Sequence, residues 1–259
     1  MPRLVVVPCL RDNYAYLTGR GDAREVAIVD PSEPDPVVRA LDEHGLRPVA
    51  ILCTHHHYDH VGGVEPLVER YGPLPVYGHR SDAGRVPRLD HPLDHGDELE
   101  AAGLRWRALH VPGHTLGALA YVGEGLVFTG DTLFGAGCGR LFEGTAELLY
   151  ASLAERLGRL PGATLVYPGH EYTESNLRFA SAVEADNAAL AARTRAVAAL
   201  RSAGAPSVPS TIADELATNP FLRVTEPAVR AFVEPRLGAT RGPAAVFAAL
   251  RAAKDEYRG

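Results

Sequence analysis

The chain has 259 residues, enough for one large domain or for a main domain with an appendage. Its hydrophobic content of 46% and charged content of 22% are ordinary for a globular protein, and no apolar run is long enough to predict a transmembrane helix. The net charge is −6, divided into −9 over residues 1–174 and +3 over residues 175–259, which is too mild for a nucleic-acid-binding stripe. We therefore expect neither nucleic acid nor a membrane as a partner.

The N-terminal stretch "MPRLVVVPCLRDNYAYLTG" predicts an opening strand. It lacks the long apolar core and the small-residue cleavage site of a secretory signal. Three scattered cysteines without a CxxC pair favour a reducing compartment over a disulfide framework. We therefore expect a cytoplasmic protein, and we expect it to be a monomer.

Apolar, β-rich runs alternate with loops or helices as far as about residue 173. Helical spacing marks residues 35–45 and 146–160. Strands with interspersed helices predict a layered α/β architecture. The runs with β-branched and aromatic residues, which we predict to be strands, are 24–30, 49–54, 74–78, 104–111, 118–123, 125–131 and 163–169.

From about residue 174 the sequence becomes rich in alanine and arginine. Helices are predicted over 184–204, with Asp186 as the cap, and over 242–259. On the second helix Arg251 and Lys254 are three apart and share one flank, and Lys254 is the single lysine among 26 basic residues. We predict two domains, a catalytic domain of residues 1–173 and a helical substrate-binding domain of residues 174–259.

The segment "CTHHHYDHVGG" places four histidines and an aspartate within residues 54–60. Crowded imidazoles repel one another when protonated, so this segment makes sense if a metal ion replaces the protons. Alternating side chains of an extended segment project the same way, so His55, His57 and Asp59 suit converging ligands. His60 completes the set. We expect His56 to point away from its neighbours and either to support a ligand or to be structural.

Three further candidate ligands each follow a predicted strand: His114 in "VPGHT", Asp131 in "VFTGD" and His170 in "VYPGH". Imidazole and carboxylate donors without thiolate suit Zn, Fe or Mn. Seven ligands are too many for one tetrahedral ion but suit two ions that share a carboxylate. The assignment we predict is His55, His57 and His114 on one ion, Asp59, His60 and His170 on the other, and Asp131 as the bridge.

Two nearby features need separate interpretation: Asp30 has two alternative roles, and the glycine run does not match a nucleotide-binding loop. Asp30, at the end of a predicted strand, is either an acceptor that orients a ligand imidazole or a plain turn aspartate. The glycine run "GAGCGR" (135–140) lacks the spacing of a nucleotide-binding loop, and we expect a flexible loop at the rim of the site.

The motif T-H-x-H-x-D-H with its three downstream ligands resembles the metallo-β-lactamase superfamily, whose fold is an αββα sandwich with a dinuclear site at one edge. Within that superfamily the chain resembles the glyoxalase II (hydroxyacylglutathione hydrolase) family from end to end. The stretches that carry this resemblance are "DNYAYL" (12–17), "THHHYDHVGG" (54–63), "PGHT" (112–115), "GDTLFGAGCGRLFEGT" (130–145), "PGHEYT" (168–173), "NPFLR" (219–223) and "RAAKDEY" (251–257).

The resemblance implies hydrolysis of S-D-lactoylglutathione, and of related 2-hydroxyacyl glutathione thioesters, to D-lactate and glutathione. This is the second step of methylglyoxal detoxification. The implied nucleophile is a metal-bound hydroxide, with Asp59 and Asp131 as the catalytic carboxylates and two divalent ions, zinc before iron or manganese, as cofactors. The residues implied to hold the glutathione are Arg140, Phe142, Tyr172, Arg251 and Lys254.

Two of these positions depart from the family pattern. Many members have lysine at position 140 and tyrosine at position 142, where this chain has Arg140 and Phe142. Arginine keeps the charge, whereas phenylalanine loses a hydroxyl hydrogen bond worth about 1 kcal/mol. The departure therefore concerns the affinity for glutathione more than the chemistry.

Other functions of the superfamily compete with this one. A persulfide dioxygenase, a lactonase and a β-lactamase share the ligand motif, although dizinc β-lactamases typically have cysteine where Asp131 stands. A binding or regulatory protein with a dead site is a rival of another class. Such proteins usually lose ligands, and all seven are present here.

Overall fold

The computed structural model describes residues 2–238 and 242–258. The chain divides into two compact units. The first runs as far as His110 and also contains Gly117–Gly130, and the second holds Val111–Leu116 and the described residues from Asp131 on. The predicted domain boundary after residue 173 stays a prediction.

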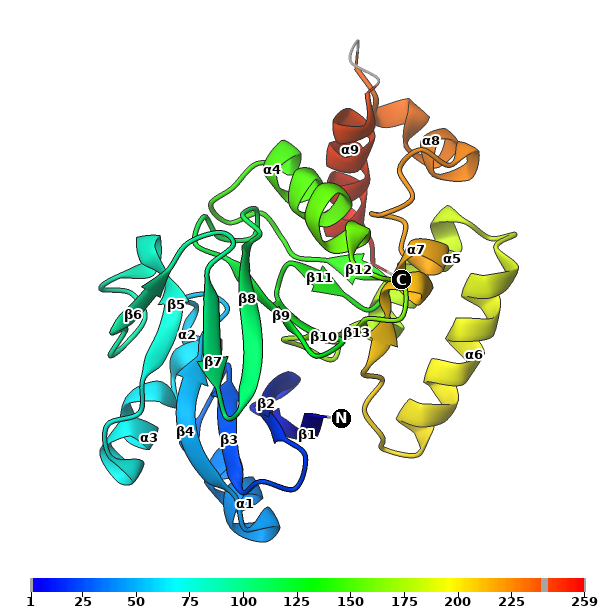
Figure 1. Cartoon of the computed structure of the whole chain (residues 1–259). Helices are drawn as coiled ribbons and strands as arrows, with labels where there is room; N and C mark the ends of the chain where they lie inside the picture. Colours follow the sequence, from blue (N-terminus) through cyan, green and yellow to red (C-terminus); the bar gives the residue numbers. More distant parts are fainter. Residues whose placement is uncertain (1, 239–241, 259) are drawn as a thin grey trace. The chain divides into compact units, whose positions relative to one another are not determined.

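The first unit contains a six-stranded sheet in which sequence neighbours are also sheet neighbours (Figure 1). Its first three strands are antiparallel and the rest are parallel, because helices return the chain after β3 and β4. The elements are β1 (Pro2–Cys9), β2 (Asn13–Arg20), β3 (Glu25–Val29), α1 (Pro34–His44), β4 (Arg47–Leu52), α2 (Tyr58–Val61), α3 (Val64–Tyr71), β5 (Val76–His79), η1 (Arg80–Asp82) and β6 (His91–Leu93).

The helices α1 and α3 bury their apolar faces in a common core with this sheet. Leu41 of α1 and Leu67 of α3 are fully buried in one cluster with Ile28 and Ile51 of the strands. Burying a leucine side chain stabilises the fold by about 1.5–3 kcal/mol. The apolar positions of the helices therefore fix them as a layer on the sheet.

A second, antiparallel sheet in the first unit contains β7 (Glu98–Ala101), β8 (Leu104–His110), β9 (Leu119–Gly123) and β10 (Leu126–Gly130). Its inner face packs against the first sheet, where the ring of Phe128 lies 5.2 Å from that of Tyr16 and 5.4 Å from that of Trp106. The hydroxyl of Tyr121 donates to the carbonyl of Cys53 at 2.9 Å. The layered α/β architecture predicted from the sequence is confirmed.

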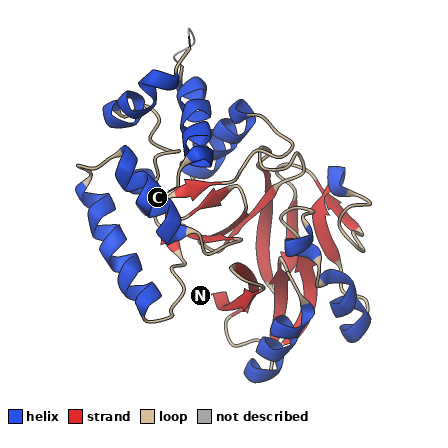
Figure 2. Ribbon diagram, turned by 180° about the vertical axis from the view of Figure 1, so that it is seen from behind, coloured by secondary structure: helices blue, strands red, loops and turns tan. Residues whose placement is uncertain are grey.

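The second unit is mainly helical in its described residues after β13 (Figure 2). Its strands form two short antiparallel pairs, β11 with β12 and β13 with β14. The elements are β11 (Leu133–Phe134), β12 (Gly137–Cys138), α4 (Ala146–Ala151), η2 (Ser152–Arg156), η3 (Leu157–Arg159), β13 (Leu165–Pro168), α5 (Thr173–Val183), α6 (Ala188–Ser202), β14 (Ser210–Thr211), α7 (Ile212–Thr218), α8 (Pro227–Val233), η4 (Glu234–Arg236) and α9 (Pro243–Glu256).

Three local expectations are corrected. The N-terminal stretch is a hairpin of two strands and not one strand. The cap of α6 is Asn187, whose side chain accepts from the amide of Leu190 at 3.1 Å, and not Asp186. The glycine run is not a flexible loop: β12 lies in it, and Gly135–Gly139 are buried.

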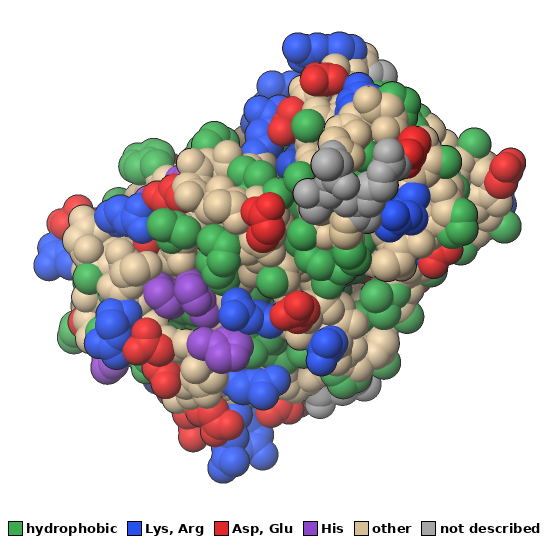
Figure 3. All heavy atoms as spheres, turned by 90° about the horizontal axis from the view of Figure 1, so that it is seen from above, with side chains coloured by type: hydrophobic (Ala, Val, Ile, Leu, Met, Phe, Trp, Pro, Cys, Tyr) green, Lys and Arg blue, Asp and Glu red, His purple; other side chains and the backbone are tan. Residues whose placement is uncertain are grey.

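On the face drawn in Figure 3, lysine and arginine side chains lie among aspartate and glutamate side chains. Positive charge therefore forms no continuous stripe on that face. Within the part of the chain that the structure describes, no helix combines the length and the apolar character needed to cross a membrane.

Candidate metal centre

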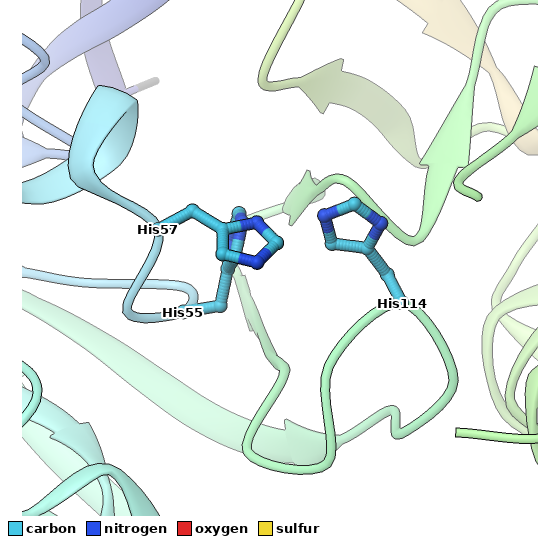
Figure 4. Close-up of side chains that lie close together, drawn as sticks. All are labelled: His55, His57 and His114. Atoms are coloured by element: carbon cyan, nitrogen blue, oxygen red, sulfur yellow. The ribbon is translucent and has the colours of Figure 1, made fainter. Parts of the chain in front are cut away.

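In the first unit, two candidate ligands come from the turn that follows β4. His55 and His57 both project from this turn (Figure 4), and His55 Nε2 lies 3.1 Å from His57 Nδ1. Two nitrogens bound to one tetrahedral ion at about 2.0 Å would be separated by roughly 3.3 Å. The spacing of the two imidazoles is therefore close to that of ligands on one ion.

Asp30 orients two of the imidazoles. Its buried carboxylate accepts from the amide and the hydroxyl of Thr54, at 2.7 and 2.6 Å, and lies 3.0 Å from His60 Nδ1. Because the Thr54 hydroxyl donates to Asp30, it accepts from His55 Nδ1, 3.1 Å away. Both Nδ1 atoms then carry the proton, which leaves Nε2 unprotonated, the form that binds a metal.

Asp59 and His60 lie on the short helix α2 and not on the extended turn. The Asp59 carboxylate is partly exposed, and Asn13 of β2 donates to its Oδ2 at 3.1 Å and to its backbone carbonyl at 2.9 Å. Asp59 Oδ2 lies 3.8 Å from His60 Nε2. The strict alternation expected from the sequence therefore holds for His55 and His57 and ends where the helix begins.

His56 has a different set of neighbours. Its Nδ1 lies 3.3 Å from Oδ1 of the fully buried Asp82, and its Nε2 lies 3.3 Å from the guanidinium of Arg85. Arg85 in turn pairs with Asp82. The imidazole of His56 thus lies beside the ion pair of Arg85 with the buried Asp82.

In the second unit, one carboxylate oxygen lies near two imidazoles. Asp131 Oδ2 is 3.5 Å from His114 Nε2 and 3.3 Å from His170 Nε2. His114 Nδ1 donates to the carbonyl of Arg140 at 2.8 Å, which leaves His114 Nε2 as the metal-binding atom. The ring of His170 stacks on that of Tyr172 at 4.7 Å and 6°. One carboxylate oxygen therefore lies at ligand-to-ligand spacing from two imidazoles.

The donor set suits a divalent metal ion, because it combines imidazole nitrogens with carboxylate oxygens. Figure 4 draws the imidazoles of the first of three groups that could each hold an ion. Among the described residues these groups are His55, His57 and His114; His55, His60 and Asp131; and Asp59, His60 and His170. All seven ligands predicted from the sequence belong to one or more of them.

The two residues of the predicted substrate set that follow the β11–β12 hairpin lie at the surface. The Arg140 side chain is 72% exposed, with its Nε 3.8 Å from Oδ1 of Asp255. Phe142 is 65% exposed, and its ring meets that of His114 edge-on at 5.2 Å. Both side chains are therefore accessible to a ligand beside His114.

The two predicted substrate-binding residues on α9, Arg251 and Lys254, differ in burial. Arg251 is 5% exposed and donates to the carbonyl of Cys138 and to Asp255, each at 3.0 Å. Lys254 is half-buried and donates to the carbonyl of Ser175 at 3.2 Å. Burial, with the positive charges of Arg251 and Arg178 nearby, lowers the pKa of Lys254 to about 8.

Two supporting residues were not singled out from the sequence. Thr54 connects His55 to Asp30, and Asn13 holds Asp59. Each lies in a stretch that carries the family resemblance, "THHHYDHVGG" and "DNYAYL", and that position was the available signal. Their hydrogen-bond partners are distant in sequence, so no local pattern reveals them.

Comparison with known proteins identifies the family. A family model described as "Metallo-beta-lactamase superfamily" matches residues 11–170, and one described as "Hydroxyacylglutathione hydrolase C-terminus" matches residues 171–257. The hydroxyacylglutathione hydrolase of Alkalilimnicola ehrlichii is 52% identical over 259 residues, which are 99% of this chain and 100% of that protein. The chain belongs to the hydroxyacylglutathione hydrolase family.

Solved structures share the fold of this chain. A crystal structure of the BLEG-1 B3 metallo-beta-lactamase has a TM-score of 0.63 at 26% identity, over 86% of this chain and 99% of that chain. A crystal structure of TTHA1623 in a di-iron-bound form has a TM-score of 0.58 at 31% identity, over 85% of this chain and 100% of that chain. The predicted αββα metallo-β-lactamase fold with a C-terminal helical domain is confirmed.

Membership of the hydroxyacylglutathione hydrolase family also decides the class of activity. The chain is a hydrolase of the metallo-β-lactamase superfamily with a divalent-metal-binding cluster of histidines and aspartates. Hydrolysis of a hydroxyacylglutathione thioester, the function expected from the sequence, is confirmed at the level of the family.

Proposed function

We propose that the chain hydrolyses S-D-lactoylglutathione and related 2-hydroxyacyl glutathione thioesters at a centre of two divalent ions, most simply zinc. The observation that carries the proposal is the position of Asp131 Oδ2, within 3.5 Å of the Nε2 atoms of both His114 and His170. One carboxylate oxygen between two imidazoles suits a bridge between two ions better than a mononuclear site.

In this proposal the seven ligands divide into two sets around Asp131. His55, His57 and His114 hold one ion, and Asp59, His60 and His170 hold the other. The hydrogen bonds of Asp30, Thr54 and the Arg140 carbonyl support the ligand role of three of these residues, because they set the tautomers of His55, His60 and His114 so that Nε2 is the ligand atom.

When bound, the divalent ions lower the pKa of water towards neutrality and polarise the thioester carbonyl. The chain's own residues orient the reacting groups. Asp59, held by Asn13, orients the attacking oxygen, and Asp131 keeps the ligand geometry. The leaving thiolate has an ordinary pKa of about 8.5, so it departs without a strong general acid. The proposed reaction therefore requires no dedicated acid.

The glutathione end of the substrate is assigned to the second unit. Arg140 and Lys254 supply positive charge for its carboxylates, and Phe142 and Tyr172 supply ring surfaces beside His114 and His170. Arg251 contributes from the interior, where it already holds the Cys138 carbonyl. An exposed ion pair of this kind is worth about 1 kcal/mol or less.

The cellular setting belongs to the same proposal. All three cysteines are buried free thiols, which is typical of a reducing compartment such as the cytoplasm. The monomeric state stays a prediction, and light scattering on the purified protein tests it.

The deciding experiment measures rates and metal content on the same samples. We expect the wild-type protein to contain two divalent ions per chain and to hydrolyse S-D-lactoylglutathione faster than acyl thioesters of simpler thiols. Asp131→Ala should lose turnover by at least about 1000-fold and should bind less metal, because the bridge is gone. An Asp131→Ala protein with full metal and a near-normal rate would show that the bridging role is wrong. Equal rates on all thioesters would contradict the assignment of glutathione.

A further inference from the structure

The β11–β12 hairpin and the residues that flank it lie next to all three candidate ligands of the second unit. Asp131 lies just before β11. The carbonyl of Arg140, just after β12, accepts from His114 Nδ1 at 2.8 Å. The ring of Phe134 in β11 meets the ring of His170 edge-on at 6.0 Å. The position of this hairpin therefore bears on three imidazole and carboxylate groups at once.

The hairpin cannot hold this position through its own pairing. It has only two pairs of residues, Leu133 with Cys138 and Phe134 with Gly137. In its turn, Ala136 has φ +54°, a left-handed conformation that is unfavourable for residues other than glycine. Two-stranded hairpins are marginal even when they are much longer. Its conformation must be fixed by other parts of the unit.

The main fixing contacts come from Asn219 and Glu215, both fully buried. The Asn219 amide donates to the carbonyls of Gly137 and Phe134, at 2.9 and 3.3 Å, and to Glu215 Oε2 at 3.0 Å. Glu215 Oε2 also accepts from the amide of Ala136 at 2.9 Å. The two side chains therefore bind both strands and the turn between them.

Two other side chains complete the attachment. Asn176 of α5 donates to the Gly135 carbonyl at 3.1 Å, and Arg251 of α9 donates to the Cys138 carbonyl at 3.0 Å. A Cβ atom on Gly137 would meet the Asn176 amide at 2.4 Å, so the hairpin packs directly on α5. Each residue from Phe134 to Cys138 thus has a backbone group bound by a side chain of the helical segment.

Gly139 connects the attached hairpin to the candidate ligands. A Cβ atom at this position would meet the carbonyl oxygen of Asp131 at 2.0 Å and His114 Nδ1 at 3.1 Å. The chain that leaves the hairpin is therefore in close contact with both residues. A displacement of the hairpin would displace the Arg140 carbonyl as well, and with it the acceptor that orients His114.

We propose that Asn219, together with Glu215, is a positioning residue for the metal centre. It contacts no candidate ligand itself and acts through the hairpin, which sets the separation of Asp131 Oδ2 from His114 Nε2. This inference rests on the proposed metal centre and gives a role to the "NPFLR" stretch, in which Asn219 is the first residue. Groups hydrogen-bonded directly to metal ligands typically contribute 10- to 100-fold to metal affinity, so Asn219, which is one contact further from the ligands, should contribute at the lower end of that range.

The test is a titration of metal-free protein with Co²⁺, followed by its visible absorption, in wild type and Asn219→Ala. We expect Asn219→Ala to bind Co²⁺ about 10-fold more weakly and to show a changed absorption spectrum, because the Arg140 carbonyl that orients His114 is no longer held in place. With S-D-lactoylglutathione, kcat should fall while KM changes little, since Asn219 lies behind the hairpin and not at the substrate.

Asn187→Ala is the matched control. Asn187 is also an asparagine of the helical segment that donates to a backbone carbonyl, that of Ala217, and accepts from a backbone amide, that of Leu190. Its contacts do not involve the hairpin. We therefore expect Asn187→Ala to be destabilised but to bind Co²⁺ within about twofold of wild type.

Two results would overturn the inference: wild-type affinity for Co²⁺ in Asn219→Ala, or equal weakening in both variants. If Asn219→Ala does not fold, Asn176→Ala, which removes only the bond to Gly135, decides by the same comparison. The titration requires no thioester. A wild type that binds Co²⁺ but hydrolyses no thioester would contradict the proposed function and leave this inference intact.

Discussion

At the scale of single residues, the environment of each side chain decides its role more than its type does. His55 and His56 are adjacent, yet His55 is oriented through Thr54 towards the candidate metal centre and His56 pairs with Asp82. Arg251 and Lys254 show the same contrast, because Arg251 is bound inside the protein while Lys254 is half-buried. Their chemistry towards a ligand must therefore differ.

Lys254 should make substrate binding depend on pH. Burial, then the charges of Arg251, Arg178 and Arg140, lower its pKa to about 8, while Cys138 acts in the opposite direction. The ammonium is therefore present below about pH 8 and is lost above it. An ion pair between this ammonium and a glutathione carboxylate is worth about 1 kcal/mol, and titration between pH 7 and pH 9 removes most but not all of the charge. KM should therefore rise roughly three- to fourfold over this range.

The measurement is KM for S-D-lactoylglutathione against pH in wild type and in Lys254→Arg. Arginine stays protonated throughout this range, so the variant should lack the rise assigned to position 254. The comparison also cancels the titration of the substrate's own amino group. Identical pH profiles of KM in the two proteins would contradict a charge role for Lys254.

At the scale of elements, short segments carry the candidate site and long elements support it. The ligand turn after β4, the helix α2 and the β11–β12 hairpin are all brief, and buried side chains such as Asp30 and Asn219 hold them. Where an element begins is likewise decided by one side chain, as α6 illustrates.

Replacing the cap of α6 should destabilise the protein. Asn187 accepts from the Leu190 amide and donates to the Ala217 carbonyl, so Asn187→Ala should lower the free energy of unfolding by about 1–2 kcal/mol. Asp186→Ala should change it by less than about 0.5 kcal/mol, because Asp186 is not the cap. Urea denaturation of the two variants checks this, and equal losses would show that the cap assignment is wrong.

At the scale of the whole molecule, the candidate ligands come from distant parts of the chain: His55, His57, Asp59 and His60 follow β4, and His114, Asp131 and His170 follow later strands. Such distant residues meet only in the folded chain, so metal binding at the proposed centre requires folding. A ligand that binds only the folded protein stabilises it by mass action.

Removing the metal should lower the melting temperature. At a free metal concentration 100-fold above the dissociation constant, the stabilisation is about 2.7 kcal/mol, or roughly 5–10 °C for a chain of this size. Calorimetry before and after chelation measures the shift, and added Zn²⁺ should restore it. Asp131→Ala should respond much less than wild type. A wild-type melting temperature that is indifferent to chelation would contradict metal binding by the folded protein.

The sequence by itself determined the chemistry of the candidate site. The segment from Thr54 to His60 concentrates ligand types within seven positions, and His114, Asp131 and His170 each follow a strand whose apolar pattern is local. Such patterns are readable because a strand or helix places neighbouring residues in a known relation. For the same reason, the strands β3, β4, β8, β9, β10 and β13 were predicted close to their observed bounds.

Only the tertiary structure decided which side chains hold the ligands and which face inward. Arg251 bonds to Cys138 across 113 residues of sequence, and Asn219 bonds to Gly137 across 82. The interior position of Arg251 and the rigid attachment of the glycine run both follow from these contacts, and neither leaves a periodic pattern in the chain. Partners so far apart meet through packing of the whole unit, and local propensity carries no information about that packing.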